Sequence, residues 1–218
     1  MRVIFAGTGR SATGYCRAAV EAMGVTCGHE HAFTPAGPRP SKLLAESSWM
    51  AVPYLNEYPE AFKVLVYRPP LDVIASFMKR RFFDTPSAWR DYIDAHNPSM
   101  LGLTGLEAAF EHYATWNMMA LRHADYVSSP DRIPWGEIAA RLGVKSEASS
   151  EWATVPTDVN TDAGPKPELE LSEEALADYA EGADWTVFDT YAALERRRLE
   201  DEWRISTAWF PKQDPGVG

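Results

Sequence analysis

Several kinds of residue and segment are scarce in this chain, and each scarcity excludes a class of protein. The 218 residues include two cysteines, Cys16 and Cys27, and five histidines, so we expect neither a disulfide scaffold nor a metal site. No segment approaches the roughly 18 apolar residues of a membrane helix. The first apolar run is too short for a signal peptide and leads into a glycine turn. These features predict a soluble, cytoplasmic protein.

Positive charge is scarce as well. Twenty-one Lys and Arg residues stand against 31 Asp and Glu residues, which gives a net charge of −10. A general nucleic-acid binder needs a basic face, so we expect no nucleic-acid partner. An acidic protein can still bind an anion locally, through backbone N–H groups and one or two arginines.

The order of apolar segments predicts an α/β fold in a single domain covering residues 1–218. Apolar runs indicate core strands at 2–6, 25–27, 63–67 and 125–127. Helical spacing and helix-end signals indicate helices at 12–23, 71–82, 106–123, 135–142, 172–180 and 185–203. This order favours a three-layer sandwich, in which helices cover both faces of a parallel sheet.

The segments between these elements are predicted to be less regular. Residues 28–40 are expected to form a loop, and residues 41–55 to be helical in part. Residues 84–105 carry prolines and glycines, which indicates an irregular insertion that could act as a lid. Residues 145–218 are expected to form a helical C-terminal extension.

The strongest functional signal lies between the first strand and the first helix. The strand leads into Gly7-Thr8-Gly9-Arg10-Ser11-Ala12-Thr13-Gly14. Glycines allow the backbone to approach a ligand closely, and the first N–H groups of a helix attract an anion. Arg10 adds a charge, and Ser11 and Thr13 add hydroxyl donors. We therefore predict a cradle for a phosphate or sulfate, built from Gly9, Arg10, Ser11, Ala12, Thr13, Gly14 and Tyr15.

This turn matches only half of the P-loop of nucleotide triphosphatases. The interval from Gly9 to Gly14 is correct, but Tyr15 and Cys16 stand where a P-loop has Lys and Ser or Thr. The residues that bind the γ-phosphate and Mg²⁺ are therefore missing. A dinucleotide-binding fingerprint also fails, because Ala12 takes the place of its third glycine.

A second anion site is predicted at the end of the strand at 63–67. Arg68 follows this strand, at the edge where open parallel sheets bind ligands. Ser76 lies eight positions later, in the following helix. An arginine and a hydroxyl placed in this way can hold a second phosphate through charge-assisted hydrogen bonds.

Together these segments resemble the sulfotransferases that use 3′-phosphoadenosine 5′-phosphosulfate (PAPS), in particular their bacterial-type members. Residues 7–15 are similar to the family's 5′-phosphosulfate loop, and residues 68–76 to its 3′-phosphate motif. Smaller pieces at 28–30, 47–49 and 113–117 are also similar, so the resemblance covers about residues 1–145. It implies a P-loop-like fold and metal-independent transfer of a sulfuryl group from PAPS to a hydroxyl or amine, releasing adenosine 3′,5′-bisphosphate (PAP).

The resemblance also implies roles for individual residues. Arg10 would assist catalysis at the sulfuryl group, and Glu30 is the candidate general base, with His29 and His31 as rivals. Arg10 stands where many members have Lys, and Ala12 where Gly is usual. The C-terminal Arg-Lys-Gly loop of the cytosolic eukaryotic branch is absent. These departures leave part of the 3′-phosphate contact unassigned.

Two alternative functions remain open at this point. A small-molecule or nucleoside kinase would bind ATP with Mg²⁺, and a non-catalytic module would bind the nucleotide without turnover. The acceptor, whether small molecule, carbohydrate or lipid, cannot be read from the fold.

Overall fold

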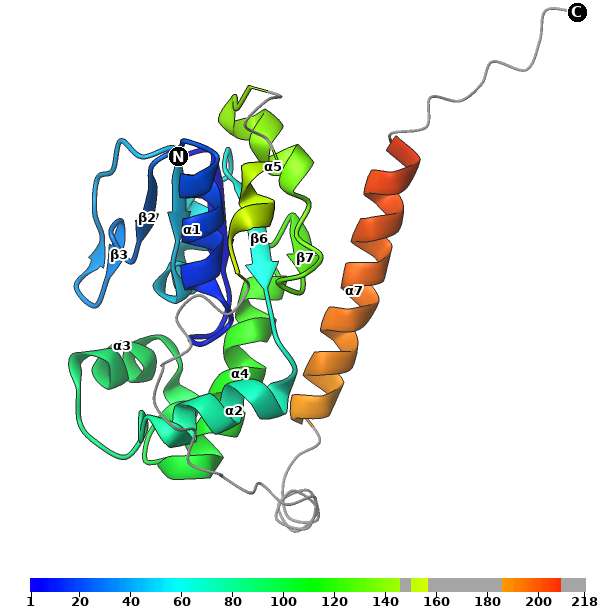
Figure 1. Cartoon of the computed structure of the whole chain (residues 1–218). Helices are drawn as coiled ribbons and strands as arrows, with labels where there is room; N and C mark the ends of the chain where they lie inside the picture. The colour runs from blue at the N-terminus through cyan, green and yellow to red at the C-terminus, as the bar shows by residue number, and fades with distance from the viewer. Residues whose placement is uncertain (146–149, 157–185, 209–218) are drawn as a thin grey trace, which may run out of the picture.

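The computed structural model describes residues 1–145, 150–156 and 186–208 (Figure 1). Its core is a five-stranded parallel sheet in the order β2-β5-β1-β6-β7. The strands are β1 (Val3–Ala6), β2 (Cys27–His29), β5 (Ala45–Ser47), β6 (Phe62–Val66) and β7 (Tyr126–Ser128). The predicted α/β class and the parallel sheet are therefore confirmed.

Alternation along the strands divides the core into two layers, because successive side chains point to opposite faces of a sheet. Val3 and Phe5 pack on the face covered by α1 (Thr13–Ala22) and α5 (Trp135–Leu142). Ile4 and Ala6 pack on the other face. That face is covered by the 3-10 helix η1 (Trp49–Glu57), α2 (Pro70–Lys79) and α4 (Gly105–Leu121). Both faces of β1 and β6 are buried, which explains the apolar runs in these two strands.

The segment between residues 25 and 48 contains more strand than the sequence predicts. The expected strand at 25–27 is shifted to β2, which ends at His29. The expected loop contains a small antiparallel hairpin of β3 (Phe33–Thr34) and β4 (Gly37–Pro38). Strand β5 was not predicted, and it lies between β2 and β1. Two of its three residues are polar. The strand is therefore too short and too polar to give a recognisable apolar pattern in the sequence.

The predicted irregular insertion at 84–105 is largely helical. It contains α3 (Ala88–His96), whose start is capped by the Ser87 hydroxyl, and the short helix η2 (Pro98–Met100). The Tyr92 hydroxyl donates a 2.6 Å hydrogen bond to the Met50 carbonyl of η1. Pro86 precedes α3, and Pro98 is the first residue of η2, a position that needs no N–H donor, so neither proline interrupts a helix. The role as a lid stays a prediction.

The long helix α7 (Thr186–Ala208) lies beside the edge strand β7 (Figure 1). The buried Asp201 carboxylate accepts a 3.0 Å hydrogen bond from the Val127 N–H, which pairs part of this open sheet edge. Before it, the described part of the C-terminal region contains the short helix η4 (Glu151–Thr154). The helix predicted at 172–180 lies outside the described residues. Among the described helices, none has the length and apolarity needed to span a membrane.

Candidate anion-binding site at the carboxyl edge of the sheet

The two predicted anion sites lie next to each other. Strands β1 and β6 are paired in parallel, so the segments that follow them leave the same edge of the sheet. Arg68 Nη1 donates a 3.3 Å hydrogen bond to the Arg10 carbonyl oxygen, and Arg10 Nε donates one of 2.8 Å to Ser76 Oγ. The Tyr113 hydroxyl holds the Arg68 carbonyl at 2.8 Å. Arg10, Arg68 and Ser76 therefore form one connected group.

The backbone of the glycine turn is bent at two residues that are not glycine. Arg10 and Ala12 have φ angles of 71° and 66°, in the left-handed region. Helix α1 follows with no side-chain cap and no acidic residue in its first turn. The Cys16 N–H donates to the Ala12 carbonyl at 3.1 Å. The N–H groups of Thr13, Gly14 and Tyr15 come before this first helical bond and are directed out of the helix start.

The hydroxyl groups of the turn already have protein partners. Ser11 is fully buried, and its hydroxyl pairs with the Thr8 hydroxyl. Thr13 Oγ1 lies 3.3 Å from His29 Nε2, and the Thr13 carbonyl accepts a 2.7 Å hydrogen bond from Ser47 Oγ. In this structure Ser11 closes the turn from inside, while Thr13 ties the start of α1 to the ends of β2 and β5.

The two residues that break the P-loop pattern point into the protein. Tyr15 is 2% exposed and packs edge-on against Trp135, with ring centroids 5.9 Å apart. Cys16 is fully buried, and burial raises the pKa of its thiol. Tyr15 can therefore offer a ligand its backbone N–H but not its side chain.

Glu30 and His29 lie at the end of β2, on the other side of the helix start. Glu30 is partly buried, and burial raises the pKa of its carboxyl group, with a smaller contribution from the charge of Glu46. A hydrogen bond from the Trp49 side chain acts in the opposite direction. Burial and, to a lesser degree, Arg17 lower the pKa of His29. A carboxylate with a raised pKa is suited to accept a proton near neutral pH.

Trp49 connects Glu30 to the glycine turn. A side chain added at Gly9 would meet the Phe77 ring at 3.4 Å and the Trp49 indole at 3.9 Å. The Trp49 side chain also interacts with the Glu30 carboxylate, whose pKa it lowers. Trp49 also contacts a cluster of rings, formed by Phe82, Trp89, Tyr92, His112 and Trp116. Trp49 thus joins the glycine turn, the candidate base and this aromatic cluster.

His112 is buried inside this cluster, and neither of its ring nitrogens has a hydrogen-bond partner among the described residues. Burial lowers its pKa to about 3. Both side-chain polar atoms of Asn117, one turn further along α4, are likewise buried and unpaired among these residues. Buried polar groups are normally satisfied. Asn117 belongs to the segment 113–117 that resembles the sulfotransferases, whereas no pattern in the sequence singles out His112.

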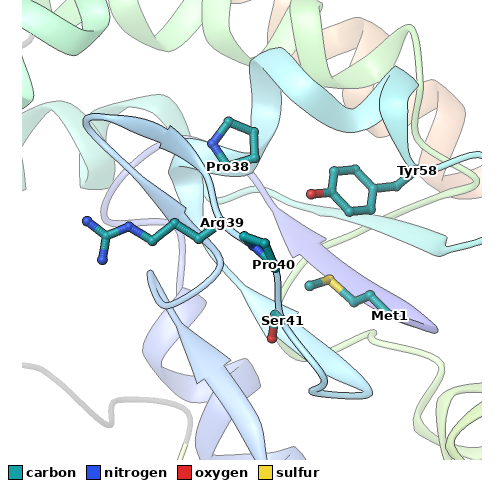
Figure 2. Close-up of a pocket in the computed structure, with 6 residues that line it drawn as sticks. All are labelled: Met1, Pro38, Arg39, Pro40, Ser41 and Tyr58. Carbon is teal, nitrogen blue, oxygen red and sulfur yellow. The ribbon is translucent and has the colours of Figure 1, made fainter.

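A separate hollow lies at the opposite edge of the sheet, where the strands begin (Figure 2). It is lined by Met1, Pro38, Arg39, Pro40, Ser41 and Tyr58. The Arg39 side chain extends away from the other lining residues (Figure 2). This hollow therefore lies away from the edge that carries Arg10 and Arg68.

Comparison with known proteins adds no further information on this site. No protein-family model matches the chain, and neither a curated protein nor a solved structure does. Glu46 and the contacts of Trp49 were missed by sequence reasoning, because both depend on the unpredicted strand β5.

Proposed function

We propose that the protein is a PAPS-dependent sulfotransferase, which transfers a sulfuryl group to a hydroxyl or amine without a metal. The observation that carries this proposal is the connection between the two motifs, from Arg68 through the Arg10 carbonyl to Ser76, at 3.3 and 2.8 Å. A nucleotide with phosphates on both sides of its ribose needs two neighbouring anion sites. ATP, whose phosphates form one chain, does not.

Each motif has its own task in this proposal. The N–H groups at the start of α1 bind the 5′-phosphosulfate and stabilise the charge that grows on its bridging oxygen as the bond to sulfur breaks. Arg68 and Ser76 bind the 3′-phosphate. Arg10 contacts Ser76 while its backbone belongs to the first site, so it can serve both anions. PAPS itself supplies the activated sulfuryl group.

Glu30 is the proposed base on the acceptor side. Its carboxylate takes the proton of the acceptor as the new oxygen–sulfur or nitrogen–sulfur bond forms, and the electron pair of the broken bond stays on the 5′-phosphate of PAP. The raised pKa of Glu30 supports this role. His29 remains the rival, since it lies beside Thr13 at 3.3 Å.

The burial of the Tyr15 and Cys16 side chains does not support the kinase alternative. A kinase needs a cation on the γ-phosphate and an oxygen ligand for Mg²⁺ at these positions. Here both side chains are packed in the core, against Trp135 in the case of Tyr15.

Nucleotide binding by the Arg68→Ala variant tests the proposal. We expect wild-type protein to bind PAP, with a clear rise in melting temperature, and to respond weakly to ATP with Mg²⁺. Arg68→Ala should weaken PAP binding roughly 10- to 100-fold, the effect of losing a charge-assisted hydrogen bond. Binding of adenosine 5′-phosphate, which lacks the 3′-phosphate, should stay unchanged.

The matched control is Arg122→Ala, at the exposed end of α4. It removes one positive charge at a position away from the site. The affinities for PAP and for adenosine 5′-phosphate should both stay unchanged. A wild-type response to ATP with Mg²⁺ and none to PAP would overturn the proposed donor. If Arg68→Ala weakens the binding of PAP and of adenosine 5′-phosphate equally, Arg68 does not bind the 3′-phosphate.

A further inference from the structure

Glu46 is a carboxylate placed where a sheet normally has an apolar side chain. It is the middle residue of β5, a strand between two neighbours, and it is fully buried. Its register partner on β2 is Gly28. A Cβ added to Gly28 would overlap Glu46 Oε2. The space above Gly28 is thus filled by the Glu46 carboxylate, which explains why a glycine stands inside this strand.

The carboxylate of Glu46 binds the backbone of the turn that carries Glu30. Glu46 Oε1 accepts a 2.8 Å hydrogen bond from the His31 N–H. The backbone N–H groups of Glu30 and Ala32 also favour the charged form of Glu46. Its second oxygen, Oε2, is buried without a hydrogen-bond partner among the described residues. Burying a carboxylate costs free energy unless the group is well paired. We therefore expect Glu46 to have a role that compensates for this cost.

The turn itself needs support. Glu30 has a φ angle of 57°, in the left-handed region, which is strained for any residue with a side chain. The Glu30 N–H lies 3.4 Å from the Ser47 carbonyl, a long hydrogen bond that holds it weakly. Glu46 therefore supplies the shorter contact to this turn, from the residue next to Ser47 on β5.

We propose that Glu46 is a positioning residue: its buried carboxylate holds the backbone of residues 30–32 and so fixes the carboxylate of Glu30 beside Trp49. This inference rests on the proposed function, in which Glu30 is the base. Glu46 itself does not reach an acceptor, because it is enclosed by Gly28 and the turn. Its effect passes through Glu30.

Electrostatics add a second consequence of the same placement. The charge of Glu46 helps to raise the pKa of Glu30, after burial, while the hydrogen bond from Trp49 lowers it. Burial also raises the pKa of Glu46, against the hydrogen bonds and the charge of His31. The Cys27 thiol and the Tyr58 hydroxyl face Glu46 too, and the pKa of each is raised, chiefly by burial. Neutralising Glu46 should therefore move the titration of Glu30 to lower pH.

The Glu46→Gln variant tests the inference by nuclear magnetic resonance. Gln keeps one carbonyl acceptor but loses the charge, so the amides of residues 30–32 should exchange with solvent at least about tenfold faster. The Glu30 carboxyl group, assigned by its loss in Glu30→Gln, should titrate at lower pH than in wild type. The titration reports the charge of Glu46, and the amide exchange reports its hold on the turn. A Glu46 with a merely structural role would lower the melting temperature without speeding the exchange of these amides more than that of the other strand ends.

Glu57→Gln, at the exposed end of η1, is the matched control and should change neither measurement. If Glu46→Gln does not fold, Glu46→Asp carries the test, since it keeps the charge but draws the carboxylate away from the turn; the same amides must then exchange faster. Unchanged exchange and an unchanged Glu30 titration would overturn the inference. PAP binding, measured on the same samples, should be unchanged, and its absence in wild type would instead refute the donor assignment.

Discussion

Two strand–turn–helix units leave the sheet side by side, β1 to α1 and β6 to α2, and their helices begin in opposite ways. The first unit enters its helix through glycines and the left-handed residues Arg10 and Ala12, with no acidic residue in the first turn. The second enters through Pro69 and Pro70, and Asp72 lies in its first turn. Asp72 also pairs with Arg68 at 3.4 Å.

This difference determines which groups each unit can use to bind an anion. The first unit presents backbone N–H groups, which accept any phosphate or sulfate. The second has prolines, which lack an N–H, and a negative side chain at the helix start. The N–H groups of Leu71 and Asp72 precede its first helical hydrogen bond, from the Val73 N–H to the Pro69 carbonyl, but the Asp72 carboxylate opposes an anion there. In the proposed function its contribution is therefore the side chains of Arg68 and Ser76. On the proposed function, the first unit binds the reacting group and the second selects the nucleotide.

The largest effect is expected from Gly7→Ala, which tests how closely the two units must approach. A Cβ at Gly7 would overlap the backbone oxygen of Val66 at the end of β6. Backbone atoms cannot move aside as a side chain can, so the strand ends must separate. We expect a loss of about 3 kcal/mol in the free energy of unfolding, measured by urea denaturation.

Gly136→Ala provides the matched control for this substitution. Gly136 lies in α5, and a Cβ there meets no atom within 4 Å. Ala should stabilise this helix by about 0.5–1 kcal/mol. Equal effects of the two substitutions would mean that the strand ends are not in close contact in solution.

Acid should lower the stability of the core that packs against the second unit. Phe77 of α2 packs against the buried ring of His112, with centroids 5.5 Å apart. The pKa of His112 is lowered from 6.5 to about 3 in the folded protein. Below its unfolded pKa only the unfolded chain binds the proton, so stability falls as the pH drops from about 6.5 toward 3. Between pH 7 and pH 5 the titration of His112 should lower the free energy of unfolding by about 2 kcal/mol.

The comparison that isolates His112 is a His112→Phe variant, in which the ring remains but cannot titrate. Denaturant unfolding at pH 7 and pH 5 should give a smaller acid loss for the variant. Glu30 and Glu46 have raised pKa values and contribute the opposite slope, but they are present in both proteins and cancel. Parallel pH profiles would show that His112 is protonated in the native state or exposed to solvent.

The two units could be predicted from the sequence because their signals are local. The glycine turn sits between a clear apolar strand and a helix, and Arg68 directly follows the strong run that became β6. Only the parallel register places them together, and the class of sheet follows from the order of elements. The neighbourhood of Arg10, Arg68 and Ser76 could therefore be predicted from the sequence pattern and the expected topology.

The acceptor side was less predictable because its contacts are not local. Strand β5 is three residues long and contains Glu46, a residue rare in buried strands. Its carboxylate is explained only by Gly28 across the sheet and by the left-handed turn at Glu30. No spacing rule in the sequence connects residues 28, 30 and 46, so their relation appears only once the strands are paired.

The smallest effect is expected from Ala12→Gly, which tests the left-handed entry that distinguishes the first unit. Ala12 has φ 66° and ψ 25°, a conformation that costs a residue with a Cβ about 1 kcal/mol or more. Glycine avoids this strain but loses more entropy on folding, so we expect a net gain of about 0.5 kcal/mol in the free energy of unfolding, measured by thermal denaturation. Ala18→Gly, within α1 itself, should instead lose about 1 kcal/mol. If both substitutions destabilise equally, residue 12 is not left-handed in solution, and the N–H groups of α1 are not presented as the first anion site requires.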